Sequence, residues 1–263
     1  MKLWLGTGLV AQDDARLSPF DRGFTLGDGL FETLRVREGA VLRLEAHLAR
    51  LAAGAGVLGL PLPALDLAAA LAATAVANDL TEGVLRLTLS RGTGPRGVLP
   101  PAEPNPTLVI TAAPLPAPAP PARLVIAQGT RRNDRSPLAQ VKSLNYLDNI
   151  LARQEAARRG ADDGVLLNTR EGVAETSIAN LFAVIGGDLV TPPLAEGVLP
   201  GIMRAAVLTE GAGERPLTVE DLSRAEEIFL TSALGIRSVA ALEGREVAGR
   251  AIAERLRARI PGA

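Results

Sequence analysis

One lysine is the residue whose type most directly suggests chemistry in this chain. The protein has 28 basic residues, and only two of them, Lys2 and Lys142, are lysines. Arginine stays charged near neutral pH, whereas lysine shifts its pKa readily and can supply a neutral amine. Lys2 stands at the N-terminus, so Lys142 is the candidate for an amine that forms an imine with a carbonyl. The alternative is that Lys142 remains by chance and has no catalytic role.

An aldehyde cofactor at Lys142 would need three further groups around it. A phosphate group needs an anion site, and the segment Pro200–Arg204 predicts a helix start with a glycine and free backbone N–H groups. A ring nitrogen needs an acid, and Glu175 is predicted in a turn of small residues. A substrate carboxylate needs a cation, for which Arg50 and Arg96 are the candidates.

Two other features suggest chemistry that we do not assign. Residues 92–97 match G-x-G-x-x-G, but a dinucleotide site requires a helix at the last glycine, and Pro100 and Pro101 exclude one. We interpret these glycines as a bend that brings Arg96 to a ligand; the alternative is a plain surface loop. His47, the only histidine, is predicted on a helix and interpreted as a packed residue.

Composition excludes several classes of function. The chain has 263 residues, is 47% apolar and has a net charge of −1, with no block of like charges that would indicate nucleic acid or an anionic membrane as a partner. It has no cysteine and one histidine, so no disulfide, thiol nucleophile or metal site is expected. The apolar N-terminus is interrupted by Gly6 and Gly8 and is interpreted as a strand, not a signal peptide. We expect a cytoplasmic protein.

The elements that must position these residues follow from hydrophobic patterning and turn signals. A hairpin is predicted around Glu38-Gly39, and Gly59 and Pro61 end the first predicted helix. The predicted strands are 31–37, 40–44, 84–89, 107–111, 123–127, 164–168, 180–185, 188–191 and 227–231. The predicted helices are 45–60, 65–78, 144–159, 201–210 and 250–260. Strands and helices are mixed without strict alternation, which predicts an α+β fold.

A proline-rich segment divides the chain. Five prolines fall within residues 113–121, a composition that favours an extended, stiff linker over a helix or strand. We therefore expect a small N-terminal α/β domain over residues 1–113, a linker over 114–121 and a larger C-terminal, cofactor-binding domain over 122–263.

Five segments, taken together, resemble a known family. They run from Asp21 to Thr33, His47 to Leu51, Lys142 to Leu147, Glu175 to Phe182 and Leu199 to Arg204. Their order and spacing are similar to those of class IV (fold type IV) pyridoxal-phosphate enzymes. This group contains branched-chain aminotransferases, D-amino acid aminotransferases and 4-amino-4-deoxychorismate lyases.

The resemblance implies a fold, a cofactor and a set of roles. The fold would be the two-domain, D-amino acid aminotransferase-like fold with pyridoxal 5'-phosphate between the domains, usually in a homodimer whose partner chain helps to close the site. Lys142 would be the Schiff-base lysine and proton carrier, and Glu175 would pair with the pyridine nitrogen. Arg50 and the backbone at Ile202 and Met203 would bind the cofactor phosphate. Tyr146 would contact the phenolic oxygen of the cofactor. Phe31 and Arg96 would bind an amino-acid-like substrate.

Three local details favour the lyases within this group. The loop at Ser90–Gly97 is similar to theirs, with Val98 where D-amino acid aminotransferases have a histidine. Ala233 stands where aminotransferases tend to have a phosphate-binding threonine, and Ser232 is the candidate replacement. Met203 stands where branched-chain aminotransferases usually have threonine. The resemblance thus implies elimination of pyruvate from 4-amino-4-deoxychorismate to give 4-aminobenzoate for folate synthesis.

Two alternatives remain open at this point. The first is an aminotransferase that acts on branched-chain or D-amino acids with 2-oxoglutarate, since the same cofactor serves both reactions. The second is a cofactor-binding protein that no longer catalyses and has a scaffold role.

Overall fold

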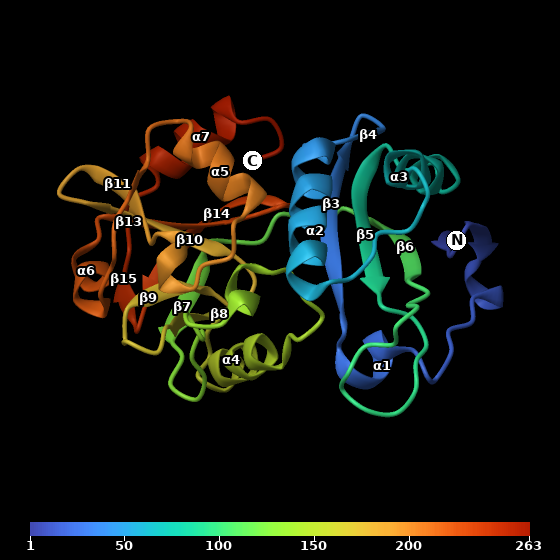
Figure 1. Cartoon of the computed structure of the whole chain (residues 1–263). Helices are drawn as coiled ribbons and strands as arrows, with labels where there is room; N and C mark the ends of the chain where they lie inside the picture. Colours follow the sequence, from blue (N-terminus) through green and yellow to red (C-terminus); the bar gives the residue numbers. More distant parts are fainter. The chain divides into compact units, whose positions relative to one another are not determined.

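The computed structural model describes residues 1–263, which form two compact units (Figure 1). Unit 1 consists of Met1–Pro116 and Val141–Asn145; unit 2 consists of Ala117–Gln140 and Tyr146–Ala263. The chain leaves unit 1 within the proline-rich segment 114–121 and returns to it for the five residues that contain Lys142.

Unit 1 is built on a six-stranded antiparallel sheet with the order β2-β1-β6-β5-β3-β4. Its strands are β1 (Lys2–Leu5), β2 (Gly8–Ala11), β3 (Gly29–Arg37), β4 (Ala40–Val41), β5 (Glu82–Ser90) and β6 (Thr107–Pro114). Its helices are α1 (Arg22–Leu26), α2 (Leu44–Leu58) and α3 (Leu67–Val76). The sheet and the helices α2 and α3 share one hydrophobic core.

Local sequence signals account for most of unit 1. The predicted hairpin is confirmed: Val36 pairs with Val41, and Glu38 and Gly39 both take positive φ, as a tight turn between twisted strands requires. Gly59 ends α2 in the left-handed conformation, and the Asp66 side chain caps α3. The helix 65–78 is shorter than predicted and less buried, because Val76 is 75% exposed.

The two faces of β3 differ in character. Leu30, Leu34 and Val36 point into the core, since alternate residues of a strand share a face. Glu32 belongs to this same inward-facing row. Phe31 lies on the opposite face, across from Thr88 of β5.

The returning segment 141–145 pairs with the start of β3. The Phe31 backbone N–H donates to the Lys142 carbonyl at 3.0 Å, and the Leu144 N–H donates to the Gly29 carbonyl at 2.9 Å. Val141 packs into the core of unit 1. Backbone hydrogen bonds and apolar burial therefore hold Lys142 directly beside Phe31.

Unit 2 is built on a nine-stranded mixed sheet, with the path β12-β11-β10-β13-β14-β7-β8-β9 and β15 paired to β14. Its strands are β7 (Ala122–Ile126), β8 (Asp163–Leu167), β9 (Val173–Thr176), β10 (Asn180–Ile185), β11 (Asp188–Thr191), β12 (Gly213–Glu214), β13 (Glu227–Ser232), β14 (Gly235–Leu242) and β15 (Arg245–Glu246). Its helices are α4 (Leu147–Arg158), α5 (Ile202–Leu208), α6 (Val219–Arg224) and α7 (Ala251–Arg259).

Both faces of the central strands in unit 2 are buried. Leu181 and Ala183 of β10 enter one apolar cluster together with Leu222 of α6. Phe182 enters another, where its ring stacks on Phe229 at 5.2 Å between centroids, near residues of α5 and α7. Burial on both faces explains why these strands are continuous apolar runs instead of alternating ones.

The α+β fold is confirmed, and so are the long helices and strands, with ends that shift by a few residues. No helix opens after Gly97, which confirms that the glycine pattern is not a dinucleotide motif. The prediction that Glu175 lies in a turn is wrong: it lies in β9, paired with Leu166 of β8. Five of the strands, β2, β9, β12, β14 and β15, and the short helices α1 and α6 were not predicted from the sequence. No helix has both the length and the apolar character to cross a bilayer.

Candidate active site

The Lys142 amine lies over an aromatic ring in unit 1. Its Nζ is 4.3 Å from the centroid of the Phe31 ring, and the Arg86 guanidinium carbon is 3.9 Å from the same centroid. Phe31 is 5% exposed and Lys142 is half-buried. The structure thus brings together two residues predicted for the site, Lys142 and Phe31, with the amine above the ring.

A buried carboxylate orients Arg50 in the same unit. Glu32 is 1% exposed and accepts from the Arg50 Nε at 2.8 Å, the second Arg50 nitrogen at 2.6 Å and the His47 Nδ1 at 2.7 Å. Burial alone would raise the pKa of Glu32, but the hydrogen bonds from His47 and Arg50 outweigh it and hold the pKa below its ordinary value. His47 is packed against this carboxylate, as predicted.

Glu32 had no role in the sequence-based prediction, although a signal was present. It is the one charged residue in an inward-facing row of leucine and valine, and a carboxylate in such a row requires buried partners. The helix that follows in the chain supplies both partners, one turn apart at positions 47 and 50.

In unit 2, Glu175 is a buried carboxylate with three polar partners. One oxygen forms an ion pair with Arg132 at 3.1 Å, and the other accepts from the Asn180 side chain at 2.9 Å and the Leu199 backbone N–H at 3.2 Å. Glu175 is 5% exposed. Donors of this kind stabilise the charged carboxylate, which is the form that can accept from a protonated ring nitrogen.

The Gly201 turn adjoins this carboxylate through Asn180. Gly201 is the N-cap of α5, as predicted, and no side chain caps it. A Cβ on Gly201 would lie 1.8 Å from the Asn180 side-chain oxygen, so only glycine fits. The backbone N–H groups of Ile202 and Met203 begin the helix and have no partner within it, which makes this turn suitable for an anion.

The remaining predicted residues are found in both units. Tyr146 is the half-buried N-cap of α4, and Ser232 ends β13, where its hydroxyl accepts from the Leu234 N–H at 3.2 Å. The buried hydroxyl of neighbouring Thr231 has no hydrogen-bond partner. Arg96 lies exposed in the loop between β5 and β6.

Comparisons with known proteins identify the family. The model of the class IV amino-transferase family matches residues 29–242, and the chain belongs to this family. A Methanocaldococcus jannaschii protein named "Putative branched-chain-amino-acid aminotransferase" is 34% identical over 271 residues, covering 97% of this chain and 92% of that protein.

Two solved structures show the likeness in three dimensions. The 4-amino-4-deoxychorismate lyase of Pseudomonas aeruginosa has a TM-score of 0.83 at 35% identity and covers 98% of this chain and 99% of its own. The branched-chain amino acid aminotransferase of Escherichia coli has a TM-score of 0.90 at 27% identity, with coverage of 97% and 91%. The family comprises pyridoxal-phosphate-dependent aminotransferases and lyases.

The residues of this chain fit that cofactor. Glu175 has the negative charge and the acceptor oxygens that a protonated pyridine nitrogen would require, and the Gly201 turn leaves backbone donors for a phosphate. Lys142 carries the primary amine that an aldehyde would require.

Proposed function

We propose that this chain is a pyridoxal-phosphate-dependent aminodeoxychorismate lyase, which eliminates pyruvate from 4-amino-4-deoxychorismate to give 4-aminobenzoate for folate synthesis. The observation that carries the proposal is 35% identity with the Pseudomonas aeruginosa lyase across nearly the full length of both chains. Val98, Ala233 and Met203, at the positions that separate the subfamilies, support it.

Specific residues of the chain would hold the cofactor. Glu175 would accept a hydrogen bond from the ring nitrogen, and Arg50 with the backbone at Ile202 and Met203 would bind the phosphate. Tyr146 would donate to the phenolic oxygen, and Ser232 would supply the hydroxyl that threonine supplies in aminotransferases. When bound, the cofactor withdraws electrons from the carbon that carries the substrate amine.

Lys142 would move the proton in the reaction. Its neutral amine removes the proton from the ring carbon that carries the amino group, and the neighbouring carbon–oxygen bond to the enolpyruvyl group breaks. The leaving group gains a proton at its methylene carbon and departs as pyruvate, while the ring becomes aromatic. Arg96 would bind a substrate carboxylate and Phe31 would contact the substrate beside Lys142.

The direct test is stoichiometric release of pyruvate and 4-aminobenzoate from aminodeoxychorismate. Lys142→Ala should abolish turnover and remove the visible absorbance that the lysine–cofactor bond gives the purified protein. An absorbance band that persists in this variant would refute the assignment of Lys142. A wild-type protein that is colourless and inactive would favour a scaffold role.

A second candidate is an aminotransferase, which the 34% identity with the Methanocaldococcus jannaschii protein favours. Addition of a branched-chain or D-amino acid, followed by 2-oxoglutarate, separates the two reactions. Rapid conversion of the cofactor to its amine form by the amino acid alone, without pyruvate release from aminodeoxychorismate, would support the aminotransferase.

A cytoplasmic homodimer of two-domain subunits, with boundaries at 113 and 122, is part of the same proposal. Phe20 and Phe24 are 72% and 79% exposed in unit 1, and large apolar side chains in water favour association. Light scattering after gel filtration should give about twice the 27.3 kDa mass of one chain. A mass near that of one chain would contradict the homodimer.

A further inference from the structure

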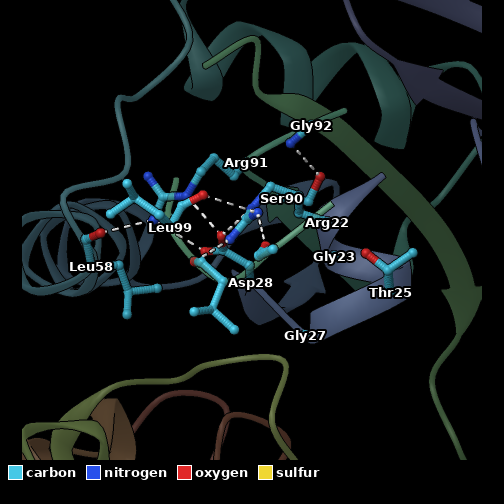
Figure 2. Close-up of polar contacts among 12 residues, drawn as sticks. Arg22, Gly23, Thr25, Gly27, Asp28, Leu58, Ser90, Arg91, Gly92 and Leu99 are labelled. Atoms are coloured by element: carbon cyan, nitrogen blue, oxygen red, sulfur yellow. Dashed lines mark hydrogen bonds and ion pairs between the residues drawn. The ribbon is translucent and has the colours of Figure 1, made fainter. Parts of the chain in front are cut away.

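Two buried arginines share one carboxylate in unit 1 (Figure 2). The Asp28 side chain accepts from the Arg22 Nε at 2.8 Å and from two nitrogens of Arg91 at 2.8 and 3.1 Å. The side chains of Arg22 and Arg91 are 4% and 3% exposed. Asp28 thus orients two guanidinium groups, and each of them has further N–H donors that bond to other parts of unit 1.

Arg91 uses its remaining donors at the end of α2. It donates to the Leu58 and Gly59 carbonyls at 2.8 Å each. The last carbonyls of a helix lack partners within it and favour a positive charge. Arg91 therefore has a structural role, because it fixes the end of α2.

Arg22 uses its remaining donors on the loop between β5 and β6. It donates to the carbonyls of Gly97 at 2.9 Å, Val98 at 2.8 Å and Leu99 at 3.4 Å. The side chains of Val98 and Leu99 are 84% and 82% exposed, so apolar burial contributes little to holding this part of the loop. A single planar guanidinium holds three consecutive carbonyls of an exposed segment.

The charge balance keeps this arrangement intact near neutral pH. Burial opposes the ionised form of Asp28, but the hydrogen bonds and charges of Arg91 and Arg22 hold the pKa of Asp28 below its ordinary value. The carboxylate therefore stays charged and Arg22 keeps its orientation.

We infer that Arg22 is a positioning residue for Arg96, which immediately precedes the three carbonyls; this inference rests on the proposed role of Arg96 in binding the substrate carboxylate. Fixing the backbone from Gly97 to Leu99 restricts where the Arg96 main chain can lie. When the loop is already ordered before binding, less conformational entropy is lost as the substrate binds, and binding is stronger.

The conservative variant Arg22→Lys separates positioning from charge. Lysine keeps a positive charge beside Asp28, but its compact ammonium cannot reach three carbonyls as a planar fork does. The matched control is Arg16→Lys, because Arg16 also donates to two backbone carbonyls, those of Asp13 and Ala15, in another exposed segment of unit 1.

Release of the loop is measurable by trypsin, which cleaves after lysine or arginine and so has the same sites in all three proteins. Mass spectrometry of the fragments follows cleavage between Arg96 and Gly97 in the cofactor-loaded enzyme. We expect this cleavage to be about tenfold faster in Arg22→Lys, since local opening controls access of the protease, and unchanged in Arg16→Lys. Equal cleavage rates in Arg22→Lys and the wild type would overturn the inference, whatever reaction the enzyme catalyses.

Kinetics then test the link to Arg96. We expect Arg22→Lys to raise KM about tenfold with little change in kcat or in cofactor absorbance, as misplacement of a substrate-binding group does. In the double variant Arg22→Lys/Arg96→Gln, KM should equal that of Arg96→Gln alone, because the two residues act through one contact.

The outcomes separate the inference from the proposed function. Independent, multiplied effects of the two substitutions on KM would overturn the positioning role while leaving Arg96 as the anchor. No effect of Arg96→Gln on KM would instead overturn the proposed anchor, and the inference with it. If the wild type transaminates and releases no pyruvate, the same KM comparisons apply to the amino-acid substrate.

Discussion

Each unit has one buried carboxylate among its candidate site residues, and each carboxylate contacts an arginine and a second side chain. Glu32 holds Arg50 and His47 in unit 1, while Glu175 is held by Arg132 and Asn180 in unit 2. Glu32 fixes the direction of a cation. Glu175, in contrast, is itself the group proposed to meet the cofactor.

The buried pair of Glu32 and Arg50 can be compared with an exposed pair of equal length. The Arg50–Glu32 and Arg224–Glu220 contacts are both 2.6 Å, but Glu32 is 1% exposed and Glu220 is 67% exposed. Glu32→Gln should lower the free energy of unfolding by about 3 kcal/mol, since it leaves Arg50, whose side chain is only 10% exposed, without its counter-charge. Glu220→Gln should change it by less than about 0.5 kcal/mol.

Urea unfolding at pH 7 measures both changes. Equal, small effects of the two substitutions would mean that burial does not strengthen the Glu32 pair.

The proposed role of Glu175 predicts a kinetic effect. Glu175→Gln keeps the shape of the side chain but removes the charge that would stabilise a protonated pyridine. We expect kcat to fall about a hundredfold, the size typical of losing one preorganised electrostatic group, with the cofactor still bound. The control is Glu171→Gln in the turn between β8 and β9, where Glu171 pairs with Arg131 at the surface. Similar kcat values for Glu175→Gln and the wild type would remove Glu175 from the site.

At the scale of elements, the start of α5 is fixed by packing as well as by hydrogen bonds. Asn180 donates to both Glu175 and the Leu199 carbonyl, and its side-chain oxygen occupies the space beside Gly201. One side chain therefore links the proposed pyridine partner with the proposed phosphate site.

Gly201→Ala tests this linkage. The added methyl group would collide with Asn180, so we expect a loss of about 1–3 kcal/mol in the free energy of unfolding and weaker cofactor binding, measured by absorbance titration. Gly56→Ala in α2 is the control, since nothing lies within 4 Å of the added methyl. That change should stabilise the protein by about 0.5–1 kcal/mol. Undiminished cofactor affinity in Gly201→Ala would contradict the linkage.

Sequence patterns predicted those elements whose signals are local. The hairpin at Glu38-Gly39 and the helix ended by Gly59 depend on turn and cap residues within a few positions. Strand β14 has no such signal, because Arg237 and Ser238 interrupt the pattern of its apolar residues. It is a strand because its backbone pairs with β13 and β7, which lie elsewhere in the sequence. The pairing of Lys142 with Phe31 joins residues more than a hundred positions apart, so no local pattern contains it. For the same reason Arg132 was not predicted as the partner of Glu175.

At the scale of the whole molecule, the free energy of unfolding should depend on pH through two carboxylates of unit 1. The pKa values of Asp28 and Glu32 are lowered in the folded protein, so each contributes stability above its unfolded pKa of roughly 4. That contribution is lost as the pH falls through the lowered folded values. We expect the free energy of unfolding to fall steeply below about pH 4 and less steeply in Asp28→Asn/Glu32→Gln. Urea unfolding at several pH values measures this dependence. If the free energy of unfolding falls equally with pH in the wild type and the double variant, these two carboxylates are not its cause.

The return of residues 141–145 to unit 1 has a consequence for biosynthesis. The edge of β3 that receives Ser143 stays without this partner until more than half of the chain has been made. Unit 1 therefore cannot be completed on the ribosome before unit 2 has begun to emerge. The chain passes between the units three times, after residues 116, 140 and 145. A single cut at the proline-rich segment would therefore leave residues 141–145 of unit 1 on the C-terminal fragment. A gene split there would separate Lys142 from the rest of unit 1, to which it belongs.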